Sequence, residues 1–355
     1  MDFRHKTRSV TIRNIQIGGD APISVQSMTK CATSDAAAVI EQTHALASAG
    51  CDIIRVAVPD ELSARAVELI TKESPIPIVA DIHFDYRLAL ITIAGGVDAV
   101  RINPGNMRRE SHLRAVAGAA KAARIPIRIG VNSGSLERSL LRKHGGPTAA
   151  ALAESALLCA QKFEAWGFSD IKLSLKSHDI AQTVAAYRKV AAACDYPLHL
   201  GITATGSGRE AELKSAIGIG SLLLDGIGDT IRVSLSSSPL DEVELGIALL
   251  NVLGLRPRGV EFVACPTCGR CKVDLLSYLE TIKRQLADIG GGICVAVMGC
   301  VVNGPGEARQ ADIGVAFSDD GTANLFRRGK RYAAGPADQM VERLAADARR
   351  LTPKS

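Results

Sequence analysis

The chain has 355 residues, of which 47% are hydrophobic and only 4% aromatic, and its 42 basic and 37 acidic side chains give a net charge of +5. This length exceeds one ordinary domain and is compatible with a barrel of about 250 residues followed by a module of about 100. The mild charge is spread along the chain without a basic run or an aromatic platform, which excludes a typical nucleic-acid-binding surface. No segment resembles a signal peptide or a membrane span, so we expect a cytoplasmic protein that does not contact the membrane.

Short β-rich runs alternate with Ala- and Leu-rich stretches over the first two thirds of the chain. The runs are ISVQS (23–27), DIIRVAV (52–58), IPIVAD (76–81), VDAVRI (97–102), IPIRIGV (125–131), DIKLSL (170–175), PLHLGI (197–202) and DTIRVSL (229–235). The intervening segments have apolar residues at helical spacing, and several begin with Ser, Thr or Asp and end at Gly. Because strands that alternate with helices form parallel sheets, the pattern predicts an α/β fold, a (β/α)8 barrel over residues 1–256.

Alternation along the predicted strands brings many polar side chains to one face. Active sites of such barrels lie at the carboxyl ends of the strands, where inward-pointing residues alternate with outward-pointing ones. Residues that share a face within their own strand are Asp81 and His83; Arg101 and Asn103; Arg128 and Asn132; Lys172, Ser174 and Lys176; His199 and Thr203; and Arg232 and Ser234. Arg55 lies in the middle of an apolar run. A charged side chain in such a strand must be paired or face a ligand, because burying it alone is costly.

Two interpretations account for these cations. They could form a structural network with acidic residues near the strands, namely Asp52, Asp81, Asp98, Asp170 and Asp229. Such a network is a credible explanation for one or two of the cations. It is a weaker explanation for four arginines and at least one lysine at a single barrel mouth. The planar guanidinium matches phosphate oxygens, so we favour an anionic, polyphosphorylated substrate. No Walker-type or G-x-G-x-x-G loop supports a nucleotide, and the loops RINPGN and GITATGSG are weak candidates for phosphate cradles.

The pattern changes after residue 256. A strand (VEFVA), a cysteine-rich loop, a helix (273–290), a strand (ICVAVMG) and a second cysteine loop are followed by a strand (DIGVAF), a polar hairpin and a helix after Pro336. This order predicts a small α+β domain over residues 257–355. Disulfides are rare in a reducing cytoplasm, so the clustered cysteines of this domain indicate a metal or cluster site.

Three kinds of site could use these cysteines. Structural zinc commonly uses two C-x2-C pairs, and Cys265 with Cys268 supplies only one. A ferredoxin-type cluster would use Cys265, Cys268, Cys271 and the distant Cys300. A [4Fe–4S] cluster held by three cysteines and a weaker oxygen ligand would use Cys265, Cys268, Cys300 and Glu307. Spacing alone does not choose between a ligand role for Glu307 and an ordinary loop carboxylate.

Motifs along nearly the whole chain resemble those of one enzyme family. They are PISVQSMT, DIIRVAVP, VADIHFDYRLAL, RINPGN, IPIRIGVNSGSLE, SLKSHD, LHLGIT, KSAIGIG, GIGDTIRVSL, ACPTCGR and GCVVNGPGEA. In this order they resemble the 4-hydroxy-3-methylbut-2-enyl diphosphate synthase family of the non-mevalonate isoprenoid pathway. The resemblance implies a (β/α)8 barrel followed by a [4Fe–4S] domain. It also implies a homodimer in which the cluster of one subunit closes over the barrel mouth of the other.

The implied reaction is the two-electron reductive ring opening of 2-C-methyl-D-erythritol 2,4-cyclodiphosphate, with loss of water, by a ferredoxin- or flavodoxin-dependent oxidoreductase. The resemblance makes Cys265, Cys268 and Cys300 the cluster ligands and Glu307 an exchangeable fourth ligand with a catalytic role. Asp81 and His83 are the further catalytic candidates. The implied substrate-binding residues are Arg55, His83, Arg101, Arg128, Asn132 and Lys176.

Two residues depart from the family pattern. Ala204, in GITATG, stands where the family usually has a glutamate, and Cys271 follows the CPTCGR motif where no cysteine is expected. We interpret Cys271 as a thiol near the cluster rather than a ligand. Two alternatives stay open: an iron–sulfur reductase of the same fold acting on a different phosphate ester, and a zinc-stapled domain on a non-redox barrel enzyme.

Overall fold

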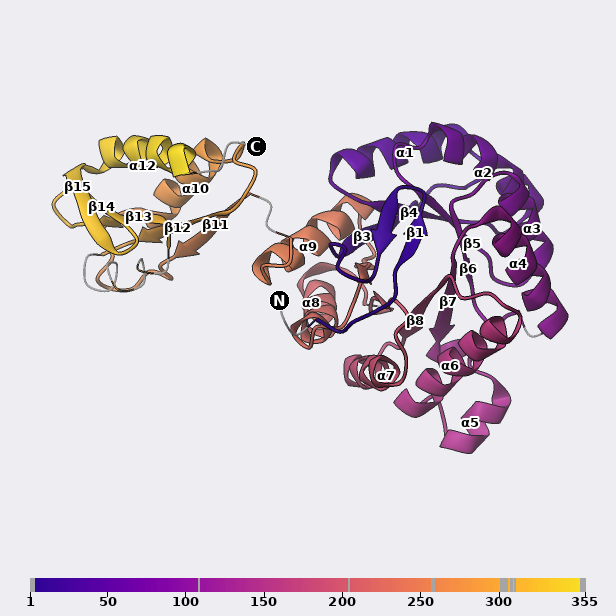
Figure 1. Ribbon diagram of the computed structural model, residues 1–355. Helices are drawn as coiled ribbons and strands as arrows, with labels where there is room; N and C mark the ends of the chain where they lie inside the picture. The colour runs from indigo at the N-terminus through magenta and orange to yellow at the C-terminus, as the bar shows by residue number, and fades with distance from the viewer. Residues whose placement is uncertain are drawn as a thin grey trace. The chain divides into compact units, whose positions relative to one another are not determined.

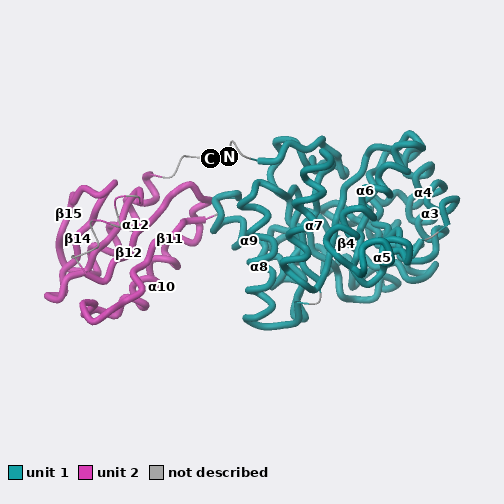
Figure 2. The backbone as a smooth tube through the Cα atoms, turned by 90° about the horizontal axis from the view of Figure 1, so that it is seen from below, with its two compact units in different colours: residues 1–256 teal, residues 257–355 magenta. Residues whose placement is uncertain are grey.

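The computed structural model describes residues 4–107, 109–203, 205–256, 259–300, 306, 309 and 311–351. Internal contacts divide the chain into two compact units, residues 1–256 and 257–355 (Figure 2). Of the helices within the described ranges, none has both the length and the apolar character needed to span a bilayer. Each unit has its own sheet, helices and core.

Unit 1 is a parallel eight-stranded barrel inside a ring of helices (Figure 1). Its strands are β3 (Ser24–Met28), β4 (Ile53–Ala57), β5 (Ile78–Asp81), β6 (Ala99–Ile102), β7 (Ile127–Asn132), β8 (Ile171–Lys176), β9 (His199–Leu200) and β10 (Thr230–Ile231). They pair in the order β8-β7-β6-β5-β4-β3-β10-β9, and a parallel bridge from Leu173 to Leu198 joins the two ends. Each of the eight runs expected from the sequence overlaps one of these strands to within one residue of its end, so the predicted barrel is confirmed.

Several of the outer helices begin at a Ser, Thr or Asp cap, as the sequence predicted. They are α1 (Ala36–Ser48), α2 (Glu61–Glu73), α3 (Tyr86–Ala94), α4 (Glu110–Ala123), α5 (Arg138–His144), α6 (Ala149–Ala165), α7 (Ile180–Ala193), α8 (Gly208–Leu224) and α9 (Pro239–Val252), with a short 3-10 turn at Ser133–Ser135. The side chains of Asp35, Asp60 and Asp179 accept hydrogen bonds from main-chain amides in the first turns of α1, α2 and α7. Ser238 forms a capping box with Asp241 at the start of α9. These caps satisfy amides that a helix leaves unpaired.

An N-terminal hairpin closes one end of the barrel. Strands β1 (Val10–Ile12) and β2 (Ile15–Ile17) pair antiparallel, and their apolar side chains join residues at the amino ends of β4, β5 and β6 in a separate core cluster. The cluster consists of Val10, Ile12, Ile17, Ile53, Val79 and Ala99. This hairpin was not predicted from the sequence. It covers the amino ends of these strands, so a ligand would reach the barrel interior from the carboxyl ends.

Unit 2 is a five-stranded mixed sheet with helices on one face (Figure 1). Its elements are β11 (Val260–Ala264), α10 (Leu275–Gln285), β12 (Ile293–Met298), β13 (Ile313–Phe317), β14 (Thr322–Arg327), β15 (Lys330–Pro336) and α12 (Ala337–Leu351). β11, β12 and β13 run parallel, while β14 and β15 pair antiparallel. Residues of α10 and α12, among them Ile282 and Leu344, pack on Val295 and Val315 of the sheet. This is the small α+β fold that the sequence predicted.

Candidate active site

Asp81, the last residue of β5, is the centre of the ion pairs at the barrel mouth. Its Oδ1 accepts a hydrogen bond from Arg101 Nη1 at 2.8 Å, and its Oδ2 lies 3.5 Å from Arg55 Nε. All three side chains are buried. Burial alone would raise the pKa of the Asp81 carboxyl, but Arg55 and Arg101 hold that pKa well below its usual value. The carboxylate is therefore ionised and orients two arginines.

His83 lies just beyond the end of β5 and contacts both Arg101 and Asn106. Its Nε2 is 3.0 Å from Arg101 Nη1, and its Nδ1 is 3.0 Å from Asn106 Nδ2. The same Nε2 lies 3.5 Å from Asp81 Oδ1. The imidazole is therefore within reach of the carboxylate, the guanidinium and the amide, and which ring nitrogen donates depends on the tautomer.

Arg128 and Lys176 are buried without a carboxylate within 4.0 Å in the part of the chain that the structure describes. Arg128 Nη1 donates to Ser174 Oγ, whereas its Nε and Nη2 have no hydrogen-bond partner among the described residues. Lys176 ends β8 and lies directly opposite Asn132, which ends β7. Arg128 therefore offers two donors that no described residue accepts, and Lys176 offers a cation that no described carboxylate neutralises.

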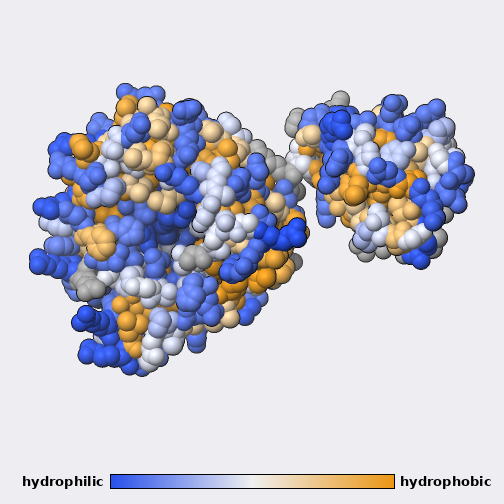
Figure 3. All heavy atoms as spheres, turned by 180° about the vertical axis from the view of Figure 1, so that it is seen from behind, coloured by the Kyte–Doolittle hydropathy of each residue, from blue (hydrophilic) through white to orange (hydrophobic). Residues whose placement is uncertain are grey.

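Mutual repulsion indicates that the buried cations occupy one region. Burial, countered in part by Asp81, lowers the pKa of Arg55 to about 9, with Arg232 and Arg101 contributing by repulsion. Burial also lowers the pKa of Lys176, again assisted by Arg232, Arg55, Arg128 and Arg101. The centre of the barrel face turned toward the viewer in Figure 3 is correspondingly hydrophilic. A bound anion would relieve this repulsion.

Most of the carboxylates considered as structural partners bind elsewhere. Asp52 pairs with Arg256, Asp98 with Arg13, and Asp229 with Arg4. Only Asp81, of the five considered, contacts mouth cations in the described residues. A structural network therefore accounts for Arg55 and Arg101 in part, and for neither Arg128 nor Lys176.

Two groups around the mouth were not predicted from the sequence. Glu242 of α9 lies 3.7 Å from Arg232 and 3.2 Å from Lys30, and it accepts from the main-chain amide of Leu235 at 3.0 Å. Strand alternation could not reveal it, because it comes from an outer helix. Asn106, which contacts His83, was considered in the sequence only as part of the RINPGN loop, a weak candidate for a phosphate cradle.

The two cysteine loops leave the same edge of the sheet in unit 2. Cys265 directly follows β11 and donates its main-chain N–H to Val297 of β12 at 3.0 Å. Cys300 lies two residues beyond β12, and parallel neighbours end at the same edge about 4.8 Å apart. Cys271 Sγ lies beside Gly299, where an added Cβ would be 2.5 Å away.

The structure describes only part of the predicted cluster site. Among the described residues, no group of three or more His, Cys, Asp or Glu side chains is spaced to hold a metal ion. Glu307 lies outside the described residues, as does Ala204 of the barrel. The ligand set therefore stays a prediction.

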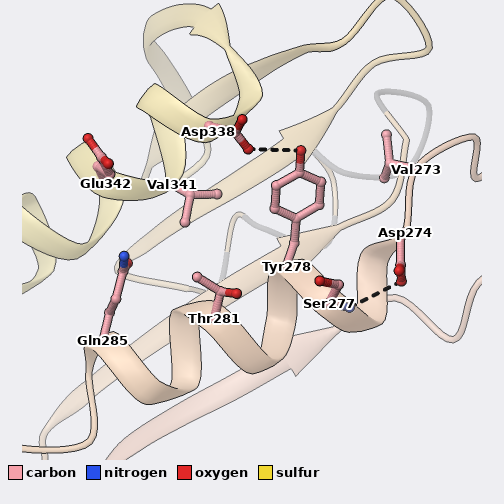
Figure 4. Close-up of a pocket in the computed structure, with 9 residues that line it drawn as sticks. All are labelled: Val273, Asp274, Ser277, Tyr278, Thr281, Gln285, Asp338, Val341 and Glu342. Atoms are coloured by element: carbon pink, nitrogen blue, oxygen red, sulfur yellow. Dashed lines mark hydrogen bonds between the residues drawn. The ribbon is translucent and has the colours of Figure 1, made fainter.

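A separate pocket of about 500 Å³ lies between α10 and α12 (Figure 4). Its lining is Val273, Asp274, Ser277, Tyr278, Thr281, Gln285, Asp338, Val341 and Glu342. Two of its carboxylates are engaged: Asp274 caps α10, and Asp338 accepts from the Tyr278 hydroxyl at 3.2 Å. No residue of the predicted sites lines this pocket.

Comparison with known proteins identifies both units. The GcpE TIM-barrel domain matches residues 7–247, and the GcpE protein C-terminal domain matches residues 261–350. The chain belongs to the GcpE family. It is similar to the 4-hydroxy-3-methylbut-2-en-1-yl diphosphate synthase (flavodoxin) of Geobacter sulfurreducens, with 50% identity over 98% of this chain and 99% of that protein. The protein of the same name from Caldanaerobacter subterraneus is 49% identical and is covered to 98%, as is this chain.

Solved structures of other families share the barrel of this GcpE-family chain. Dihydropteroate synthase from Yersinia pestis matches with a TM-score of 0.51 and 12% identity, covering 69% of this chain and 98% of that one. N-acetylneuraminic acid synthetase from Leptospira borgpetersenii matches with a TM-score of 0.50 and 14% identity, covering 79% and 97%. At these identities the likeness concerns the fold alone. Family membership, as the sequence motifs predicted, is confirmed by the GcpE matches.

Proposed function

We propose that this chain catalyses the reductive ring opening of 2-C-methyl-D-erythritol 2,4-cyclodiphosphate to 4-hydroxy-3-methylbut-2-enyl diphosphate and water, as an oxidoreductase of isoprenoid precursor synthesis. The proposal joins membership of the GcpE family to one observation at the barrel mouth. In the described residues, Asp81 pairs with two buried cations, Arg55 and Arg101, while two more buried cations, Arg128 and Lys176, have no carboxylate within 4.0 Å. Such an excess of positive charge fits a substrate that carries two phosphoryl groups.

Substrate binding is assigned to the donors that the protein leaves unused. Arg128 has two unpartnered N–H positions, and Lys176 has no carboxylate partner in the described chain. Asn132 lies opposite Lys176 and can add an amide contact. Arg55, Arg101 and His83 extend the surface on the Asp81 side. Together these six residues form the proposed diphosphate site.

Charge stabilisation is the main contribution of the barrel to the reaction. Ring opening breaks a carbon–oxygen bond to phosphate, so negative charge develops on the departing phosphate oxygen. Cations that are already held in place stabilise that charge without reorganisation. Asp81, being ionised, holds Arg55 and Arg101 and is not a proton donor. His83, which is half-exposed, is the residue of this group best placed to move a proton.

The cysteine loops of unit 2 are proposed to hold a [4Fe–4S] cluster. Cys265, Cys268 and Cys300 would be its thiolate ligands, and Glu307 would be an exchangeable fourth ligand with a catalytic role. Support comes from the thiolate-rich donor set and from the shared sheet edge at which the loops around Cys265 and Cys300 begin. When bound, such a cluster supplies the electrons and a Lewis-acidic iron.

Flavodoxin is the proposed electron donor, because the relatives that match along their whole length are named for it. Ferredoxin is the other donor class that the sequence predicted. A homodimer is also proposed, with the cluster of one subunit serving the barrel mouth of the other. Leu213, Ile217 and Leu224 are 53–63% exposed along one face of α8, where Figure 3 shows a hydrophobic area low on the right of the barrel unit. A second copy of the chain could cover this face.

Metal analysis and turnover test the proposal together. Protein purified without oxygen should contain about four irons per chain and no zinc, and it should convert the cyclodiphosphate when supplied with reduced flavodoxin. About one zinc and no iron after cluster reconstitution would favour the zinc-stapled alternative. Iron without turnover of this substrate would favour a reductase for a different phosphate ester.

A further inference from the structure

Gly130 lies in the middle of β7, and the side chain of Arg101 from the neighbouring strand β6 packs directly against it. A Cβ added to Gly130 would be 2.6 Å from Arg101 Nε and 3.0 Å from Nη2. The same Nη2 donates to the main-chain oxygen of Gly130 at 3.4 Å. Contacts this close exclude any larger side chain while the guanidinium stays in place. The glycine therefore provides the space in which Arg101 rests.

Gly201 has the same relationship to Lys176. Lys176 ends β8, and Gly201 directly follows β9, the next strand. A Cβ added to Gly201 would be 2.9 Å from Lys176 Nζ and 3.2 Å from its Cε. At β6–β7, a buried cation therefore lies along the barrel wall over a glycine of the following strand, and at β8–β9 over the glycine directly after the following strand.

We propose that Gly130 and Gly201 are positioning residues, which hold the Arg101 and Lys176 cations back against the barrel wall and keep the mouth open for a cyclic diphosphate. The identity of that ligand rests on the proposed function; the steric relationship does not. Arg101 is held on two sides, with Nη1 toward Asp81 and His83 and Nη2 toward Gly130. Any group that displaces it from Gly130 also disturbs its contacts with Asp81 and His83.

Gly130→Ala separates positioning from folding better than a change at Gly201. The atoms nearest to a Cβ at position 130 all belong to the far end of the Arg101 side chain, which can move. A Cβ at position 201 would also meet the main-chain oxygen of Arg232 at 2.8 Å, so its effects would include backbone strain. Alanine at position 130 should therefore leave the barrel folded and move the guanidinium into the mouth.

A double-mutant cycle tests the inference on the holoenzyme without reductant, with the dissociation constant for the cyclodiphosphate measured by calorimetry. Gly130→Ala should weaken binding about tenfold, the effect of one misplaced charge-assisted hydrogen bond. In an Arg101→Ala background the same change should alter binding less than about twofold, because nothing remains to be displaced. Gly118→Ala in α4, where no heavy atom apart from the adjoining main chain of its own helix lies within 4 Å of the added Cβ, is the matched control and should not change binding.

Two results would overturn the inference: unchanged binding in folded Gly130→Ala protein, or an equal loss in both backgrounds. Failure of the wild-type protein to bind the cyclodiphosphate would instead contradict the proposed function. The crystal structure of the Gly130→Ala variant then decides the inference without a ligand. Displacement of Arg101 from Asp81 supports it, and an Arg101 that keeps its contact refutes it.

Discussion

Arg101 and Asp81 lie directly opposite each other on β6 and β5, and the guanidinium donates to the carboxylate across 2.8 Å. The parallel register thus places a buried cation beside a buried anion at the carboxyl ends of two adjacent strands. Arg55, one strand further along the barrel wall, approaches the same carboxylate. A single acidic residue consequently fixes two of the proposed substrate-binding arginines.

Asp81→Asn should destabilise the barrel by about 3–5 kcal/mol, because it leaves buried arginines without their counter-ion. Denaturant unfolding followed by the fluorescence of the only tryptophan, Trp166 in unit 1, measures this change. Asp85→Asn is the matched control: Asp85 caps α3 and pairs with the exposed Arg87. Asparagine caps helices equally well, and surface ion pairs contribute little, so its effect should stay below about 1 kcal/mol. Equal effects of the two changes would contradict the role assigned to Asp81.

Lys172 should make the stability of the barrel depend on pH above neutrality. Burial, with repulsion from Arg128 and an opposing attraction to Asp229, lowers the pKa of Lys172 to about 7. An unfolded lysine has a pKa of about 10.4, so between about pH 7 and 10 the unfolded chain binds more protons than the folded one. The free energy of unfolding therefore rises with pH in this window, by about 1.4 kcal/mol per unit from this residue.

Lys172→Met removes that contribution and retains an unbranched side chain. The difference in unfolding free energy between wild type and variant should increase with pH across this window, as measured by Trp166 fluorescence in denaturant. Lys172 Nζ donates to Thr230 Oγ1 at 3.3 Å, so the variant also loses one hydrogen bond, which shifts the difference without changing its slope. A difference independent of pH would show that Lys172 is charged in the folded barrel.

The sequence alone predicted the eight strands and the face on which Asp81, Arg101, Arg128 and Lys176 meet, because both follow from local periodicity. It did not predict which carboxylate would pair with which cation. Asp52, Asp98 and Asp229 directly precede strands, so they lie at the opposite end of the barrel from the mouth and bind other arginines.

Long-range packing accounts for the remaining omissions. Glu242 reaches the mouth from α9, and no alternation within a strand could reveal a residue on an outer helix. The importance of Gly130 depends on the path of a neighbouring arginine rather than on its own sequence context. The N-terminal hairpin is made of three-residue strands, too short for a periodic signal, and packs through contacts distant in sequence.

Substrate binding should be accompanied by proton uptake at Lys176. Burial and repulsion from Arg232, Arg55, Arg128 and Arg101 lower the pKa of this lysine in the free protein. A bound diphosphate favours the charged amine and raises that pKa, so protons are taken up and affinity falls as pH rises above the pKa of the free protein. Calorimetry in buffers of different ionisation enthalpy measures the uptake, which Lys176→Met should reduce. Uptake of equal size in the variant would assign the proton to another group.

Cysteine variants should separate cluster ligands from bystander thiols in unit 2. Cys300→Ser should reduce the iron content of anaerobically purified protein from about four per chain to near zero and remove the visible absorption of the cluster. Cys294→Ser is the matched control, because Cys294 lies near the start of β12, away from the sheet edge where the loops around Cys265 and Cys300 begin.

Cys271 Sγ packs beside Gly299 and donates to the main-chain oxygen of Val273 at 3.4 Å, a role that serine can fill. Cys271→Ser should therefore retain its iron. Loss of the cluster in that variant would instead favour the ferredoxin-type ligand set, with four thiolates and no role for Glu307 at the iron.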